Sequence, residues 1–94
     1  MVEVKWTNNA LEEIDSIASY IAKDSPNYAS ILVNQIFDMV RNLIHFPKLG
    51  RVVPEYNNSN LREIIFKNYR IVYLIKEEQL EIISVIHGSR KLYL

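Results

Sequence analysis

The chain has 94 residues, with 11 basic and 11 acidic side chains, two histidines and no cysteine. This length fits one domain, so we expect residues 1–94 to fold as a single domain. The lack of cysteine excludes a disulfide framework and thiolate chemistry, and two histidines alone do not suffice for a structural zinc site. A net charge of zero argues against non-specific binding of nucleic acid. We expect no metal and no other cofactor.

The distribution of apolar and charged residues bears on where the protein acts. The first residues, MVEVKWTNN, lack the apolar segment of a signal peptide, and no run reaches the roughly 18 apolar residues of a membrane helix. We therefore expect a cytoplasmic protein without a membrane partner. Residues 1–47 carry three basic groups against six acidic ones, whereas residues 48–94 carry eight against five. The pattern predicts an acidic helical half and a basic sheet half.

The chain begins with a predicted strand and a predicted helix. Residues 2–6 alternate between apolar and polar side chains, which is typical of a short, half-buried strand. Residues 9–23 carry apolar side chains at helical spacing. Asn9 followed three places later by Glu12 resembles a capping box. We therefore expect this helix to be capped by Asn9.

A second helix is predicted directly after the first. Ser25-Pro26 is a start signal, because serine caps helices and proline is tolerated at the first helical position. The residue before a proline disfavours the helical conformation, so Pro47 should end this helix near residues 45–46. About two residues join the two helices. Such a short link predicts an antiparallel helical hairpin.

The second half of the chain reads as a connecting segment followed by a sheet. Residues 47–60 contain prolines, a glycine and an asparagine-rich cluster that break regular structure. Three β-branched runs follow at 61–67, 69–76 and 79–87, separated by short polar turns that predict an antiparallel meander. Apolar residues on both alternations indicate a sheet that is partly covered on both faces. The helical hairpin covers one face, and the chain's last residues, the connecting segment or a partner chain must cover the other.

Cationic side chains lie at or near the ends of these three runs. Arg62, Arg70, His87 and Arg90 are far apart in sequence, but a meander brings strand ends side by side. We therefore expect one compact cationic cluster on the sheet. Such a cluster suits a phosphate or an acidic partner.

A plainer interpretation of the two strand arginines is ion pairing. Arg62 and Arg70 would then pair on the sheet surface with an acidic neighbour, which could be Glu63, Glu55 or Glu81. Arg70 opens an otherwise apolar run, where a charge is costly unless it has a partner or a task.

If the chain is catalytic, its residues favour metal-free RNA cleavage through the ribose 2′-hydroxyl. His87 is a candidate general acid or base, although it could equally be a hydrogen-bonding group at a strand end. Glu55 is a candidate base and Tyr93 a candidate phenol, while arginines would stabilise the phosphate. No nucleophile elbow, phosphate-binding glycine loop or metal-ligand spacing is present in the sequence.

Several segments in this order resemble the RelE/ParE toxins of bacterial type II toxin–antitoxin modules. The likeness covers essentially the whole chain, and the order and spacing of the segments carry it. The segments are the strand and helical hairpin with Trp6-Thr7, Ala10-Leu11 and Ile14, then Gly-Arg-Val-Val-Pro-Glu (50–55), Leu-Arg-Glu-Ile (61–64), Tyr-Arg-Ile-Val-Tyr (69–73) and Val-Ile-His-Gly-Ser-Arg (85–90).

The resemblance implies an α+β fold in which a helical hairpin packs on about four mostly antiparallel strands. It also implies a cognate antitoxin that wraps and neutralises the toxin in a hetero-oligomer. The RelE-like branch cleaves messenger RNA in the ribosomal A site, and the ParE-like branch poisons DNA gyrase. In the RelE-like case, Arg62 and Arg70 match the phosphate-binding arginines, with Glu55 and His87 as acid or base.

Two features of the sequence favour the ParE-like and plasmid-stabilisation side of the family. The chain is neutral, whereas RelE-like nucleases are strongly basic, and residues 47–60 offer only Lys48 and Arg51 as cations. The Pro-Glu segment and the His-Gly-Ser-Arg ending point the same way. We therefore predict a growth-inhibiting gyrase toxin, the alternatives being an mRNA endonuclease or a degenerate, non-toxic binding partner. The predicted target-binding residues are Arg51, Arg62, Arg70, Arg90, Lys91 and Tyr93.

Overall fold

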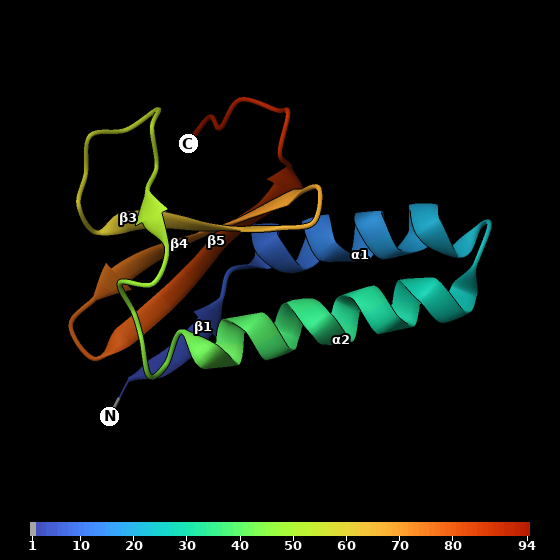
Figure 1. The fold of residues 1–94 in the computed structure, drawn as a ribbon, viewed down its shortest axis with the longest axis horizontal. Helices are drawn as coiled ribbons and strands as arrows, with labels where there is room; N and C mark the ends of the chain where they lie inside the picture. Colours follow the sequence, from blue (N-terminus) through green and yellow to red (C-terminus); the bar gives the residue numbers. More distant parts are fainter. Residues whose placement is uncertain (1) are drawn as a thin grey trace.

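The computed structural model describes residues 2–94 and shows a five-stranded sheet backed by two helices (Figure 1). This confirms the α+β class, although the sheet has five strands where about four were expected. The strands run in the order β1-β5-β4-β3-β2. The elements are β1 (Glu3–Trp6), α1 (Asn8–Ala22), α2 (Pro26–Asn42), β2 (Arg51–Val52), β3 (Leu61–Phe66), β4 (Tyr69–Lys76) and β5 (Gln79–His87).

The extra strand is β2, which lies inside the segment predicted to be a connecting loop. It pairs antiparallel with β3, Arg51 opposite Glu63 and Val52 opposite Arg62. Two residues are too few to show an alternating pattern, so periodicity could not reveal it. The β3-β4-β5 meander is confirmed, with two-residue turns between the strands. β1 pairs with β5 in parallel, which makes the sheet mixed.

The helix caps differ in part from expectation. Ser25 caps α2 as predicted, since its Oγ accepts from the Tyr28 N–H at 3.2 Å. The capping box at Asn9 is wrong, because Thr7 caps α1 by accepting from the Ala10 N–H at 3.1 Å. The Asn9 amide instead donates to the carbonyl of Ile83 in β5. α2 ends at Asn42, a few residues before the predicted end, and turns lead on from it.

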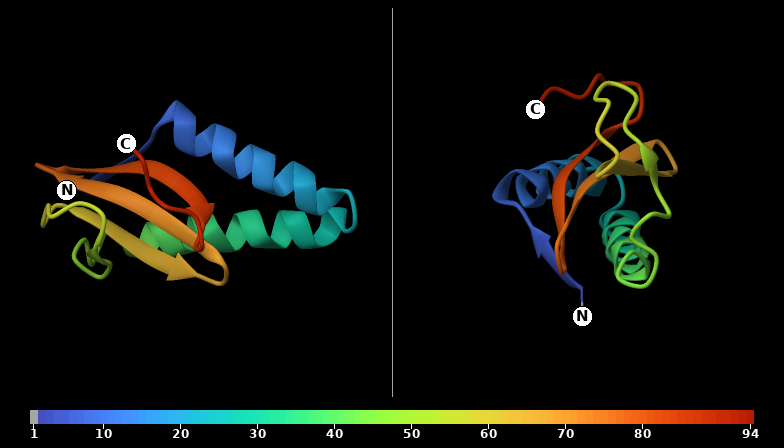
Figure 2. Two further views of the ribbon diagram at one scale, coloured as in Figure 1. Left: turned by 90° about the horizontal axis from the view of Figure 1, so that it is seen from above. Right: turned by 90° about the vertical axis from the view of Figure 1, so that its left-hand side faces the viewer.

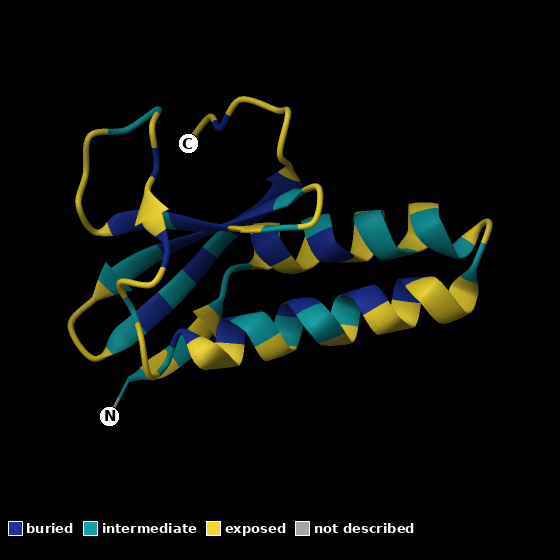
Figure 3. Ribbon diagram, viewed as in Figure 1, coloured by how far each residue is buried: buried dark blue, intermediate teal, exposed yellow. Residues whose placement is uncertain are grey.

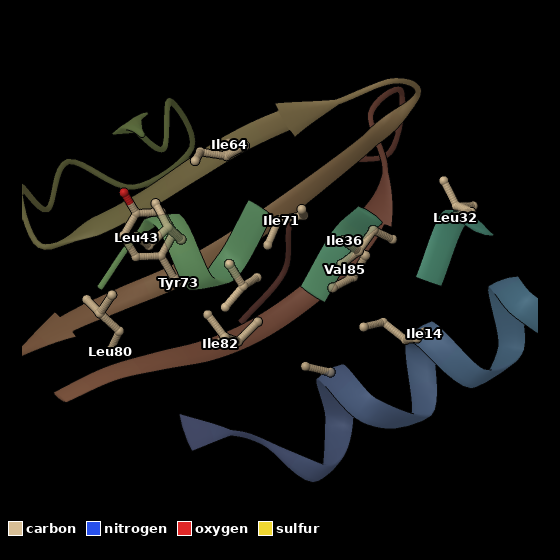
Figure 4. Packing of buried hydrophobic residues seen from close by; sticks show 12 residues of the cluster. Ile14, Leu32, Ile36, Leu43, Ile64, Ile71, Tyr73, Leu80, Ile82 and Val85 are labelled. Carbon is tan, nitrogen blue, oxygen red and sulfur yellow. The ribbon is translucent and has the colours of Figure 1, made fainter. Parts of the chain in front are cut away.

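The main core fills the space between the helical hairpin and one face of the sheet (Figures 3 and 4). Ile14 comes from α1 and Ile36 from α2, and they meet β-sheet side chains such as Ile71, Ile82 and Val85. A second, smaller core covers the helix-free face and consists of Val53, Leu61, Val72, Ile86 and Leu92. The connecting segment and the residues after β5 therefore cover that face. Within residues 2–94, neither α1 nor α2 combines the length and the apolar character that a membrane-spanning helix requires.

Tyr73 anchors the segment between α2 and β2 to the main core. Its buried hydroxyl donates to the Pro47 carbonyl at 2.6 Å and accepts from the Gly50 N–H at 2.9 Å. Burial raises the pKa of the Tyr73 phenol, so the group stays protonated and keeps donating. The fixed course of this segment thus depends on one tyrosine reaching it from β4.

Substitution of Gly50 by alanine is expected to lower the free energy of unfolding by about 1–3 kcal/mol, because no space exists for a methyl group. A Cβ at this position would lie 2.6 Å from the Glu63 carbonyl oxygen and 2.7 Å from the Tyr73 hydroxyl. Urea denaturation measures the effect. Gly88→Ala is the matched control, because the nearest atom to its Cβ is 3.3 Å away. Equal stability of both variants would contradict the close approach.

Candidate functional site

The sheet register separates the two strand arginines that were expected to form one cluster. Arg62 pairs with Tyr73, and Arg70 pairs with Ile65. In this register each even-numbered residue of β3 is opposite an odd-numbered residue of β4, and paired residues point to the same face of the sheet. An even-numbered residue of β3 and an even-numbered residue of β4 therefore lie on opposite faces. Arg62 therefore lies on the face of the helices, and Arg70 lies on the helix-free face. The predicted single cationic cluster is wrong, since a register one residue different would be needed to form it.

Arg70 is buried in ion pairs with two carboxylates. Its Nε donates to Glu63 Oε1 at 2.7 Å, and its Nη1 and Nη2 donate to the two oxygens of Glu55 at 2.8 and 2.7 Å. The Arg70 side chain is only 6% exposed, and that of Glu63 is 0% exposed. Ion pairing, the plainer interpretation, is confirmed for Arg70, while Glu81 pairs instead with Lys76. Hydrogen bonds to Glu55 raise the pKa of Arg70 above its usual value.

A second arginine completes this arrangement. Arg51 donates from Nε to Glu63 Oε2 at 2.6 Å, so Glu63 bridges two guanidinium groups. We call Arg51, Glu55, Glu63 and Arg70 the Arg70 cluster. It holds two cations and two anions, and its formal charge is therefore zero. Arg51 is exposed, whereas Glu55, Glu63 and Arg70 are largely buried, and their burial is tolerated because each charge is paired and hydrogen-bonded.

The Arg70 cluster also holds residues 88–94, which we call the tail segment. Arg70 Nη1 donates to the Arg90 carbonyl, and the Leu92 N–H donates to Glu55 Oε2, both at 2.9 Å. The Leu94 N–H donates to the Tyr56 hydroxyl at 2.9 Å. Leu92 is buried in the second core. The tail segment thus lies beside the loop between β2 and β3, at the top of the molecule in Figure 1 and in the right-hand view of Figure 2.

The pKa of Glu55 is lowered to about 2, first by hydrogen bonds from Arg70 and then by the Leu92 N–H. The carboxylate therefore stays ionised at neutral pH, where it is a weak base. Sequence reasoning named Glu55 and Glu63 as partners for an arginine. It missed that Glu55 and Tyr56 also fix the tail segment, because hydrogen bonds to backbone N–H groups leave no pattern in the sequence.

Arg62 has a different environment. Its Nε donates to the Ser59 carbonyl and its Nη1 to the Gly50 carbonyl, both at 2.9 Å. Among residues 2–94, no carboxylate lies within ion-pair distance of Arg62, so its predicted pairing with an acidic neighbour is wrong. The carbonyls orient the guanidinium without neutralising it.

His87 and the exposed cations lie around the end of β5. His87 Nδ1 lies 2.7 Å from Ser89 Oγ. The His87 ring packs edge-on against the Tyr69 ring, with 6.1 Å between the ring centroids. A cleft of about 370 Å³ separates this strand end from α1, and Arg90 contributes to its lining. Arg90, Lys91 and Tyr93 are exposed on the tail segment, and Tyr93 is 81% exposed. Backbone hydrogen bonds therefore hold a short strip of two cations and a phenol toward solvent.

Glu13 is a residue that the sequence did not single out. Its Oε1 accepts from Ser84 Oγ at 2.8 Å and from the Val85 N–H at 3.1 Å. These bonds tie α1 to the part of β5 that extends beyond β1. Acidic residues on a helix face are usually solvated, so this role of Glu13 left no signal in the sequence. The contact fixes one wall of the cleft.

The chain resembles known toxins in sequence and in fold. Residues 4–92 match the family model described as ParE toxin of type II toxin–antitoxin system, parDE. A relative called "Putative toxin Y4kP", from Sinorhizobium fredii strain NBRC 101917 / NGR234, is 34% identical over 90 residues, which cover 94% of this chain and 90% of the relative. The fold matches a chain of the chromosomal ParDE TA system from P. aeruginosa with a TM-score of 0.77 at 21% identity, covering 93% and 96% of the two chains. The chain therefore belongs to the ParE toxin family of type II toxin–antitoxin systems.

Proposed function

We propose that this ParE-family toxin inhibits DNA gyrase by binding to it, and that a cognate antitoxin holds the toxin inactive. The observation that carries the proposal is the state of Arg70, whose guanidinium is buried and already bound by two carboxylates. A phosphate would have to displace those carboxylates and enter the protein to meet it. Arg70 is therefore suited to organising the fold around it.

The positions of the other candidate catalytic residues also argue against RNA cleavage. RNA cleavage without a metal needs an acid, a base and phosphate-binding cations within hydrogen-bond reach of one phosphate. Arg62 lies on the opposite face from Arg70, and Glu55 with a pKa of about 2 is a weak base. His87 pairs with Tyr69 at the C-terminal end of β5, and its ring is hydrogen-bonded to Ser89. Binding without catalysis is the mode of action that this geometry supports best.

The tail segment supplies a surface for such binding. Arg90, Lys91 and Tyr93 are exposed, while the backbone between them is held by Arg70, Glu55 and the burial of Leu92. Arg51, which is 63% exposed, lies on the same face of the sheet. A strip that is ordered before binding loses little conformational entropy on binding. Its positive charge complements an acidic surface on the target.

Arg90→Ala/Lys91→Ala/Tyr93→Ala is expected to raise the toxin concentration needed to inhibit gyrase by about tenfold or more, because arginine and tyrosine are frequent hot spots. The measurement is supercoiling by purified gyrase, together with the amount of cleaved DNA trapped. The matched control, Lys5→Ala/Lys23→Ala/Tyr20→Ala, also removes two exposed cations and an exposed tyrosine, but from β1 and the helical hairpin. It should inhibit as the natural chain does.

The competing activities give different results in the same experiment. A messenger RNA endonuclease would cut mRNA at the ribosomal A site in a translation extract and leave supercoiling unchanged. That outcome would overturn the proposal. Expression of the chain alone provides a further test, because a non-toxic binding partner would not slow growth. Co-expression with the product of an adjacent reading frame should restore growth if that product is the antitoxin.

A further inference from the structure

The segment between α2 and β2, whose Gly50 carbonyl accepts a hydrogen bond from Arg62, exposes large apolar side chains. Phe46 is 65% exposed and Leu49 59% exposed, and Val52 lies directly opposite Arg62 in the sheet. Lys48 is also exposed. We call Phe46, Lys48, Leu49, Val52 and Arg62 the Arg62 platform. It lies beyond the C-terminal end of α2, beside the outermost strand β2, where Figure 3 shows much of the segment as exposed.

The Arg62 platform is held in place by buried hydrogen bonds. Tyr73 binds the segment through the Pro47 carbonyl and the Gly50 N–H, and Arg62 Nη1 binds it through the Gly50 carbonyl. The Leu49 N–H donates to the Phe46 carbonyl at 3.0 Å, which closes a turn. The apolar side chains are thus displayed on a fixed backbone. Fixed apolar groups lose little entropy when a partner covers them.

The charge of the platform identifies the chemistry of the partner. Arg62 donates hydrogen bonds to two backbone carbonyls. These carbonyls fix the direction of the guanidinium group but carry no negative charge to compensate it. Among residues 2–94, no carboxylate lies within 4 Å of Lys48 or Arg62. An oriented arginine offers two parallel donors to a carboxylate. Arginine and aromatic side chains together are characteristic of the centre of protein interfaces.

We propose that the Arg62 platform docks an acidic segment of a partner protein. A carboxylate of that segment binds the free side of the Arg62 guanidinium, and apolar side chains beside it cover Phe46 and Leu49. Lys48 adds a second attraction at the rim. This inference is independent of gyrase inhibition, because the platform lies on the helix-facing side and the tail segment covers the other face.

The test is a titration of the full-length, ¹⁵N-labelled protein with a synthetic acidic peptide, acetyl-Ala-Leu-Glu-Leu-Asp-Leu-Glu-Ala-amide. Its neutral counterpart, in which Gln and Asn replace Glu and Asp, is the control peptide. Chemical-shift changes should be confined to amides of residues 46–52 and 59–62. Binding should weaken about tenfold with the neutral peptide or with Arg62→Gln, as expected for the loss of a charge-assisted pair. It should also weaken when salt rises from about 20 mM to about 300 mM.

A second variant keeps the test informative if Arg62→Gln disturbs the fold. Leu49→Ser replaces a side chain that is 59% exposed and keeps the hydrogen bonds from Tyr73 and Arg62 to the backbone of this segment, and it should also weaken peptide binding. Lys76→Gln, which removes an exposed cation paired with Glu81, should leave binding unchanged. Equal binding of both peptides, shift changes confined to the tail segment, or no effect of Leu49→Ser would each overturn the proposal. None of these three results depends on whether gyrase is the target.

Discussion

Replacement of Arg70 by methionine is expected to lower the free energy of unfolding by about 3–5 kcal/mol, the cost of leaving a buried charge without its partner. Glu63, whose side chain is 0% exposed, would keep only Arg51, and Glu55 would lose its cation. The tail segment would also lose the bond to the Arg90 carbonyl. Urea denaturation at neutral pH measures the change through the shift in midpoint.

Two control variants distinguish the effect of an unpaired buried charge on stability from the effect of a simple loss of contacts. Arg70→Met/Glu63→Gln removes the buried negative charge as well, so part of the stability should return. Lys76→Met breaks the exposed pair with Glu81 and should cost less than about 1 kcal/mol. A loss of stability at Arg70 no larger than at Lys76 would be inconsistent with a buried ion pair. The prediction also bears on activity assays, because an inactive Arg70 variant could simply be unfolded.

Acidification is expected to destabilise the protein through Glu55. The pKa of Glu55 is about 2 in the folded protein, below its ordinary value of 4.5, so the folded state favours the ionised form. Its contribution is fully present above about pH 4.5 and is lost as the pH falls toward 2. Hydrogen bonds to charged groups contribute on the order of 1–3 kcal/mol each, and we expect a loss of that order. Urea denaturation at several pH values between 5 and 2 measures the slope.

Comparison with Glu55→Gln isolates this group from the other carboxylates. The variant should be less stable than the natural chain at neutral pH, and the difference should shrink as the pH falls. Glu12→Gln alters an exposed carboxyl on α1 and should follow the pH curve of the natural chain. Amide hydrogen exchange gives a second reading, since the Leu92 N–H should lose protection in Glu55→Gln. Parallel curves for Glu55→Gln and the natural chain would refute this role for Glu55.

The elements with a strong local pattern were predictable from the sequence. Both helices, the β3-β4-β5 meander and the Ser25 cap follow from periodicity, short turns and capping chemistry. The cover on the helix-free face was expected because Ile82-Ile83 and Ile64-Ile65 place apolar groups on both sides of the strands. These features depend on neighbours in the chain, which is why sequence alone was sufficient.

The candidate site was less predictable because it depends on register and on distant partners. A shift of one residue decides whether Arg62 and Arg70 share a face, and nothing in the turn at Lys67 revealed it. Glu55 reaches Arg70 from a loop 15 residues away, and Arg70 holds a backbone carbonyl 20 residues further on. Carbonyl groups are present at every residue, so the bonds of Arg62 to Ser59 and Gly50 had no sequence signal either.

The parallel pairing of β1 with β5 has a consequence for synthesis of this toxin. Thr7, which follows β1, bonds to Ile82, a residue 75 positions later in the chain. Ribosomes add about 5–20 residues each second, so the N-terminal strand waits about 4–15 s for its partner. During that interval the helical hairpin has no complete sheet to pack against. The main core therefore stays open until β5 has been synthesised.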